Sequence, residues 1–118
     1  MAKLPAWTQE FPVSITVCDK EGIILFMNDR AIESFSDEGG AALVGTNLLD
    51  CHPPRAALIV NGLLAAGRSN TYTIEKEGKK KLIFQSPWYE GGQYSGLVEI
   101  SIPLPEEMQH FVRDKKID

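Results

Sequence analysis

The sequence predicts an α+β domain built on one antiparallel sheet, because its segments follow the order strand, strand, helices, strand, strand, strand. Two hairpins carry this prediction: the turn at 19–22 joins two apolar runs, and the turn at 90–93 joins two long alternating segments. Two strands alone do not make a stable hairpin, so the first two must join the last three across the helical middle. A length of 118 residues suits one domain with one modest core.

The strand assignments rest on alternation of apolar and polar residues. Val13, Ile15 and Val17 alternate with polar or small residues, which is the two-residue period of a strand. Pro103 and Pro105 should end the last strand, because proline cannot donate a hydrogen bond to a ladder. The predicted strands are 13–18, 23–27, 70–76, 80–89 and 94–104.

The helix assignments rest on caps and on helical spacing. Asn28 should cap one helix, and Pro54 and Gly67 should bracket a longer one. A terminal helix is expected from the spacing of Met108 and Phe111, although its apolar face is sparse. The expected helices are 30–35, 55–66 and 106–116, with short helical turns at 8–11 and 46–50.

Composition narrows the class of protein. Apolar residues make up 43% and charged residues 24%, and the formal net charge of −4 argues against nucleic-acid binding, which needs a clustered basic face. No segment approaches the roughly 18 apolar residues that span a bilayer. We therefore expect a cytoplasmic protein with no membrane partner and with both cysteines reduced. Residues 1–118 should form one domain, with a core at about 12–103, an N-terminal extension at 1–11 and a helical tail at 104–118.

Three segments in this order resemble the PAS domain family over roughly residues 12–103. They are Ile15–Asp19 leading to Asn28–Ala31, Leu43–Leu49 followed by His52-Pro53, and Trp88–Gly92 leading to Gly96–Glu99. The resemblance implies a five-stranded antiparallel sheet in the order 2-1-5-4-3. It also implies helices that form a small pocket on one face, with the other face used for dimers or covered by a flanking helix.

The resemblance places several candidate ligand contacts in that pocket. They are Thr16, Cys18, Asn28, Leu48, Cys51 and His52. Each has a structural alternative: Cys18 as a small core residue, Asn28 as a helix cap, and His52-Pro53 as a turn. PAS domains that bind haem ligate it through a histidine in the helical region, so His52 is the haem candidate. No other histidine or cysteine is spaced to build a metal site.

Flavin photochemistry depends on a cysteine after Gly-x-Asn in the photosensory branch of the family. Here Leu48 follows Gly45-Thr46-Asn47, so a covalent flavin adduct at that position is excluded, while non-covalent flavin stays open. We predict no cofactor, with haem and flavin as the alternatives.

Large apolar residues on the extensions and on one strand predict an interface. They are Trp7, Phe11, Phe84, Trp88 and Phe111. One core of this size does not accommodate them all, so we expect a homodimer. The sequence shows no Ser-His-acid order and no phosphate-binding glycine loop. It therefore predicts a non-catalytic sensory and protein-interaction module in signal transduction, with an unidentified signalling partner. The alternative is a redox or gas sensor that binds haem or flavin through His52.

Overall fold

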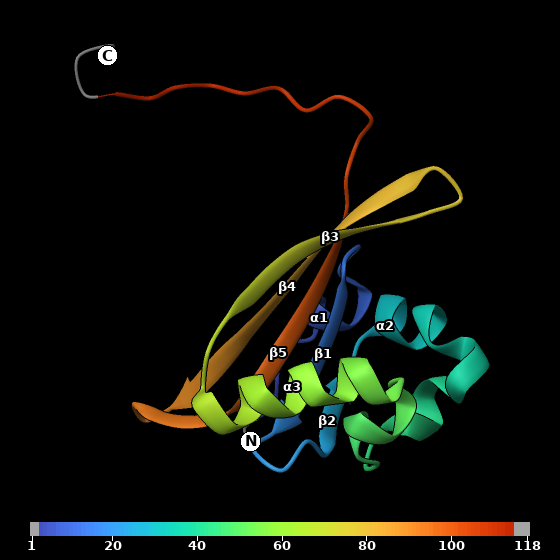
Figure 1. Cartoon of the computed structure of the whole chain (residues 1–118), viewed down its shortest axis with the longest axis vertical. Coiled ribbons are helices and arrows are strands. Elements are labelled where there is room, and N and C mark those ends of the chain that lie inside the picture. Colours follow the sequence, from blue (N-terminus) through green and yellow to red (C-terminus); the bar gives the residue numbers. More distant parts are fainter. Residues whose placement is uncertain (1–2, 115–118) are drawn as a thin grey trace.

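The computed structural model describes residues 3–114, with only the backbone of Cys51, and shows one five-stranded antiparallel sheet (Figure 1). The strand order is β2-β1-β5-β4-β3, which confirms the predicted topology. The strands are β1 (Ser14–Asp19), β2 (Ile24–Met27), β3 (Asn70–Lys76), β4 (Lys79–Glu90) and β5 (Gln93–Pro103).

The helical elements lie between β2 and β3, apart from one turn at the N-terminal end. They are α1 (Trp7–Glu10), α2 (Asp29–Ser34), the 3-10 turns η1 (Ser36–Glu38), η2 (Gly40–Leu43) and η3 (Leu48–Cys51), and α3 (Pro54–Ala66). Asn28 caps α2 by accepting from the Ala31 amide, and Gly67 ends α3 in the left-handed conformation. Among the described residues, no helix is long and apolar enough to cross a membrane.

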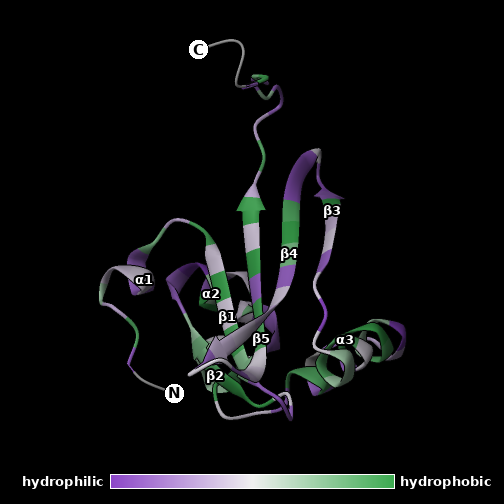
Figure 2. Cartoon of the chain, turned by 90° about the vertical axis from the view of Figure 1, so that its left-hand side faces the viewer, coloured by the Kyte–Doolittle hydropathy of each residue, from purple (hydrophilic) through white to green (hydrophobic). Residues whose placement is uncertain are grey.

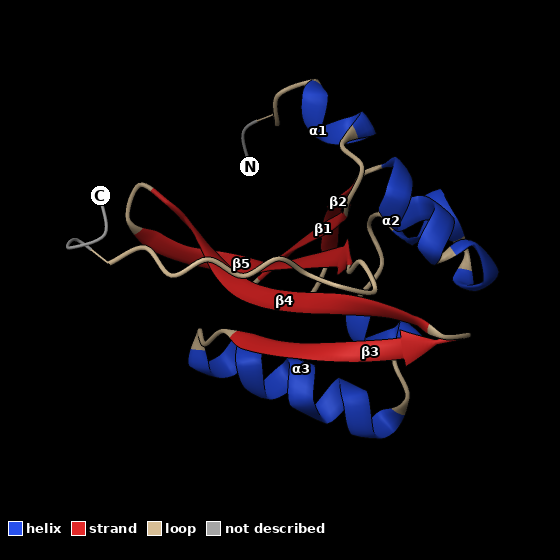
Figure 3. Ribbon diagram, turned by 90° about the horizontal axis from the view of Figure 1, so that it is seen from above, coloured by secondary structure: helices blue, strands red, loops and turns tan. Residues whose placement is uncertain are grey.

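The core lies between the helical segment and one face of the sheet. Val60, Leu63 and Leu64 of α3 pack on Cys18 and Leu97, at the junction of β1 and β5. A second cluster joins β2 to α2 and η2 through Ile24, Met27, Ala31 and Leu43. Figure 3 shows the two main helices apart from one another, α2 near β1 and α3 alongside β3. Residues of both clusters line a space that faces the middle of the sheet: Cys18 and Leu97 from the first, and Ile24, Met27 and Leu43 from the second.

The strand register decides which side chains share that face. Thr16 lies opposite Glu99, Glu99 opposite Gln85, and Gln85 opposite Asn70. Side chains of residues that lie directly opposite one another on neighbouring strands point to the same face of the sheet. These four residues therefore form one row across β1, β5, β4 and β3. The row runs under the space between the helices.

The predicted terminal helix at 106–116 is wrong for the part of it that the structure describes. Residues 104–114 contain no helix and run away from the sheet as an extended segment, the red trace in Figure 1. Met108, Phe111 and Val112 keep 64%, 66% and 60% of their surface exposed. A helix this short gains its stability by packing an apolar face, and these residues pack against none.

The N-terminal helix is a single turn, one residue earlier than the predicted turn at 8–11. The turn begins at Trp7 with Ala6 at the cap position, and the Thr8 hydroxyl donates to the Pro5 carbonyl at 2.7 Å. Gln9 Nε2 donates to Asp29 Oδ1 at 2.7 Å, which ties the turn to the start of α2.

Candidate functional site

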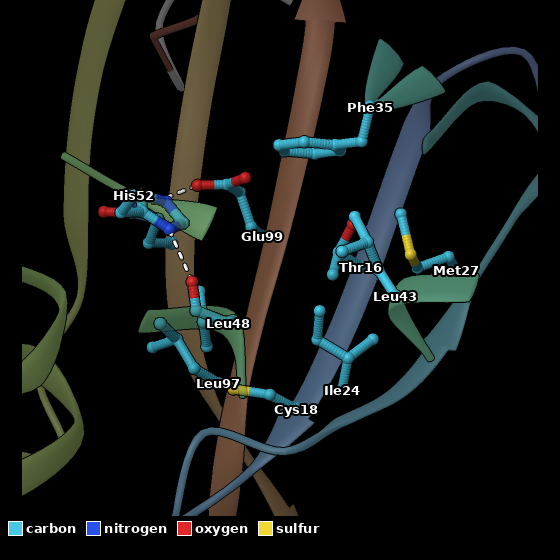
Figure 4. Close-up of a pocket in the computed structure, with 11 residues that line it drawn as sticks. Thr16, Cys18, Ile24, Met27, Phe35, Leu43, Leu48, His52, Leu97 and Glu99 are labelled. Carbon is cyan, nitrogen blue, oxygen red and sulfur yellow. Dashed lines mark hydrogen bonds between the residues drawn. The ribbon is translucent and has the colours of Figure 1, made fainter. Parts of the chain in front are cut away.

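A narrow pocket, called the cavity below, lies between the helical segment and the sheet (Figure 4). Its volume is about 20 Å³, counted as space open to the centre of a water-sized sphere, which is room for one or two water molecules. The lining residues are Thr16, Cys18, Ile24, Met27, Phe35, Leu43, Leu48, His52, Gln85, Leu97 and Glu99. Most of these side chains are apolar, and the polar ones gather along the sheet row and at His52.

The polar row is held by side-chain hydrogen bonds between neighbouring strands. Asn70 Nδ2 donates to Gln85 Oε1 at 3.2 Å, and Gln85 Nε2 donates to Glu99 Oε1 at 2.8 Å. Gln85 is only 3% exposed, so both halves of its amide are satisfied where water has little access. These bonds fix the Glu99 carboxylate at the wall of the cavity.

Thr16 lies at the end of this row and differs from the other three residues in its hydrogen bonding. Its Oγ1 atom is buried and has no hydrogen-bond partner among the described residues. Leaving a buried hydroxyl unpaired costs about 1–3 kcal/mol. The cavity wall therefore presents a polar atom that a bound molecule could satisfy.

His52 closes the cavity from the helical side. Its Nδ1 lies 2.7 Å from the Leu48 carbonyl oxygen, and because a carbonyl only accepts, this nitrogen carries a proton. Figure 4 shows the ring and the Glu99 carboxylate pointing toward one another. His52 thus bridges the η3 turn and the sheet.

Cys18 is a buried wall residue with a poorly reactive thiol. It is 2% exposed, and desolvation by burial raises its pKa to about 11. The thiol therefore stays protonated near neutral pH, where the thiolate is the reactive form. Its position suits packing against a ligand better than nucleophilic chemistry.

The cavity as it stands does not fit a haem or a flavin. Both groups are far larger than about 20 Å³ of open space. Among the described side chains, which leave out that of Cys51, no three His, Cys, Asp or Glu residues gather in the way that a metal site needs.

The structure brings four of the predicted contacts together and separates one. Thr16, Cys18, Leu48 and His52 line the cavity, and whether they bind a ligand stays a prediction. Asn28 does not line it, and the side chain of Cys51 lies outside the described part of the chain.

Asn28 has a structural role instead. It is fully buried, and its Oδ1 accepts from the Ile15 and Ala31 amides at 3.0 and 3.1 Å. Its Nδ2 lies 2.7 Å from the Val13 carbonyl and 3.1 Å from the Thr8 carbonyl. One side chain therefore joins the N-terminal segment, β1 and α2.

The interface candidates fall into three environments. Trp7 and Phe11 are 62% and 41% exposed and pack edge to face, with ring centroids 5.2 Å apart. Trp88 is half-buried and its indole donates to the Cys18 carbonyl at 2.8 Å, while Phe84 is 38% exposed. Phe111 lies on the extended segment, under the guanidinium group of Arg113.

Sequence reasoning missed Gln85 and Glu99, which supply most of the polarity of the cavity. Strand alternation places both on one face of their strands. Only the register, which the sequence does not show, sets them beside Thr16.

Comparison with known proteins identifies the fold. No family model matches the chain, and no curated protein matches it. Solved structures do. The PAS domain of BvgS from Bordetella pertussis has a TM-score of 0.62 at 21% identity, covering 83% of this chain and 81% of that one. A sensory box sensor histidine kinase from Vibrio cholerae has a TM-score of 0.60 at 15% identity, covering 83% of this chain and 86% of that one.

A third neighbour is the Aer2 receptor from Vibrio cholerae, described as a dual PAS-heme oxygen sensor. It has a TM-score of 0.58 at 18% identity, covering 79% of this chain and 95% of that one. The sheet order and the cavity beneath the helices define a small α+β domain with an internal pocket. The neighbours identify this architecture as the PAS fold, as the sequence resemblance predicted.

Proposed function

We propose that this chain is a non-catalytic PAS-type sensory and protein-interaction module. In this proposal a slender small molecule enters between the sheet and the helices by moving the helical segment outward, since the cavity as it stands has room for one or two water molecules, and the protein responds as a homodimer. The observation that carries it is the buried Thr16 hydroxyl, unpaired within the described residues, in a cavity whose other polar side chains, Gln85, Glu99 and His52, already have hydrogen-bond partners. A ligand with an apolar body and one hydrogen-bonding group matches this lining.

A route from the cavity to the outer face of the sheet supports a sensory role. Cys18 lines the cavity through its side chain, and its carbonyl accepts from the Trp88 indole. Trp88 is joined on the outer face by Val17, Phe84, Val98 and Ile100, because these positions alternate with the cavity-facing residues. Figure 2 shows hydrophobic bands along β4 and β5. A ligand that moves β1 would therefore disturb a face suited to association.

The structural neighbours add support for sensing over other functions. Two of them are a PAS domain of BvgS and a sensor histidine kinase. The neighbour described as a heme oxygen sensor keeps the second candidate open, with His52 as the contact. An absorbance spectrum of purified protein with added haem separates the two candidates. A Soret band lost in His52→Ala would establish the haem sensor and overturn the leading proposal.

The direct test uses octan-1-ol as the probe and methyl-labelled protein in NMR titrations. We expect saturable shifts at the methyl groups of Thr16, Ile24 and Met27, together with a shift of the Trp88 indole proton. Thr16→Val keeps the shape and removes the hydroxyl, so it should weaken binding by about tenfold, the equivalent of one hydrogen bond. Shifts confined to exposed apolar residues, or an unchanged affinity in Thr16→Val, would count against this function.

A further inference from the structure

A wider groove lies next to the cavity, on the same face of the sheet. Its volume is about 310 Å³ by the same measure. It shares Phe35, His52 and Glu99 with the cavity, so the two spaces adjoin at these side chains. The remaining lining residues are Ser14, Ser34, Tyr72, Ile74, Lys76, Lys81, Ile83 and Ser101.

The floor of this groove is apolar and uncovered. Tyr72 and Ile74 of β3 are 41% and 44% exposed, although they lie on the face that carries the helices. Ile83 of β4 lies opposite Tyr72 and continues the same surface toward the cavity. An apolar chain lying along this floor would cover side chains that the fold leaves in contact with solvent.

Lysines surround the outer end of the groove. Lys76 lies directly opposite Lys79 in the β3–β4 ladder, and Lys81 follows two residues later on the same face. All three line a second hollow at this end, together with Glu77 of the turn. Like charges directly opposite one another destabilise a strand pair, and a bound anion would relieve that repulsion.

The two ends of the site are a fixed distance apart. Gln85 lies about 13 Å from Lys81 along β4, and Thr16 lies two strands across from Gln85, so the backbones of Lys81 and Thr16 are about 16 Å apart by strand rise and strand spacing. A chain of about eight carbon atoms, with the reach of a lysine side chain, spans this distance. The Glu99 carboxylate at the junction repels an anion from the inner cavity, so a negative charge is favoured only at the outer end.

We propose that the ligand of this site is an amphiphilic monoanion: a slender aliphatic chain with an anionic group at Lys76 and Lys81 and a hydroxyl or carbonyl group at Thr16. This inference rests on the proposed function, because it names the class of molecule that occupies the same pocket. It assigns the groove to the ligand as well, and it makes the β3–β4 hairpin part of the binding site.

The test compares 8-hydroxyoctanoate with octan-1-ol, which differ only in a carboxylate replacing the terminal methyl group. We expect the carboxylate to bind at least tenfold more tightly by calorimetry, and this advantage should shrink with added salt. Lys81→Gln should remove most of the advantage and leave octan-1-ol binding unchanged. Lys80→Gln is the matched control, because Lys80 is on the same strand but points to the opposite face.

The outcomes separate this inference from the proposed function. Equal affinity for the two probes, or an equal loss of carboxylate binding in both lysine variants, would overturn the anionic ligand while leaving the pocket as a binding site. Failure of both probes to shift the Thr16 and Met27 methyl groups would overturn the two proposals together.

Discussion

Asn28 shows at the residue scale how one polar side chain organises three segments. It is fully buried, and each of its polar atoms has backbone partners from residues distant in sequence. Replacing it with alanine would leave several buried amides and carbonyls unpaired, which costs more than the hydrogen bonds themselves contribute. Its neighbour Met27 lines the cavity, so the same short stretch serves both the pocket and the N-terminal segment.

We predict that Asn28→Ala lowers the free energy of unfolding by about 3 kcal/mol, measured by urea denaturation. Asn47→Ala is the matched control. Asn47 also links distant backbone groups, through the Glu21 carbonyl and the Leu49 amide, but it is only half-buried. It should cost about 1 kcal/mol. Equal losses in the two variants would contradict the role assigned to Asn28.

A second residue-scale prediction concerns Cys18 and alkaline pH. Burial raises the pKa of its thiol from 9.0 to about 11, so between these values the folded protein keeps a proton that the unfolded chain loses. The unfolded state then binds fewer protons, and the free energy of unfolding falls as the pH rises from 9 to 11.

Cys18→Ala should flatten this fall, as followed by denaturant unfolding across the pH range. Burial also raises the pKa of Tyr72 and Tyr94, and the charge of Cys18 adds to the shift of Tyr94, so both proteins should carry Tyr94→Phe, while Tyr72 contributes equally in both. The difference between the two profiles therefore isolates Cys18. A difference that does not change with pH would show that the thiol pKa is not raised in this way.

At the scale of elements, the contact between β1, β4 and β5 depends on a missing side chain. Gly96 has a φ of +153°, and a Cβ there would overlap the Cys18 carbonyl and lie 2.7 Å from Trp88 Nε1. The glycine thus makes room for the indole to reach across β5 and donate to β1.

Gly96→Ala should abolish cooperative folding or lower the thermal midpoint by more than 10 °C, as seen by circular dichroism, because the overlapping atom belongs to the backbone. Gly62→Ala in α3 meets no atom within 4 Å and should raise stability by about 1 kcal/mol through helix propensity. A folded, unshifted Gly96→Ala protein would contradict the close packing described for this contact.

The sequence predicted the helices and strands correctly where the local residue pattern and the packing of the fold favour the same structure. The β-strands lie within about one residue of the predicted ranges. Helix α3 begins at Pro54 and ends before Gly67, as the proline and the glycine predicted. The segment at 106–116 failed because its helical spacing has no surface to pack on in the described chain. The sequence did not predict that Glu99 and Gln85 line the cavity. Which residues line it depends on the strand register, which here pairs residues 14 positions apart.

At the scale of the whole molecule, the outer face of the sheet is only partly covered: Val17 is 5% exposed and lines a hollow with Lys3 and Leu4, whereas Phe84 is 38% exposed. Phe84 is its exposed aromatic residue, and Trp88 and Ile100 flank it on β4 and β5. An apolar sheet face of this kind favours pairing with a second copy, which the proposed function requires.

We predict that Phe84→Glu converts a dimer into a monomer in light scattering coupled to size-exclusion chromatography, because a carboxylate cannot be buried unpaired at the centre of the contact. Ile59→Glu is the control: it places the same charge on α3, at a side chain that is 55% exposed. Dimerisation that survives Phe84→Glu, or that fails in both variants, would contradict an interface on the outer face.

The pairing of Ser14 with Ser101 has a mechanical consequence. The start of β1 and the end of β5 lie side by side at the same end of the sheet, because the two strands are antiparallel neighbours. Once the Asn28 contacts have given way, a force that pulls the two ends apart would reach this pair and open the ladder one residue pair at a time, rather than shear all its bonds together. The N-terminal pull would meet Asn28 before the ladder, since that side chain holds residues 8, 11 and 13. Tension along the chain would therefore unzip β1 from β5 and expose Thr16 and Cys18 early, at low load.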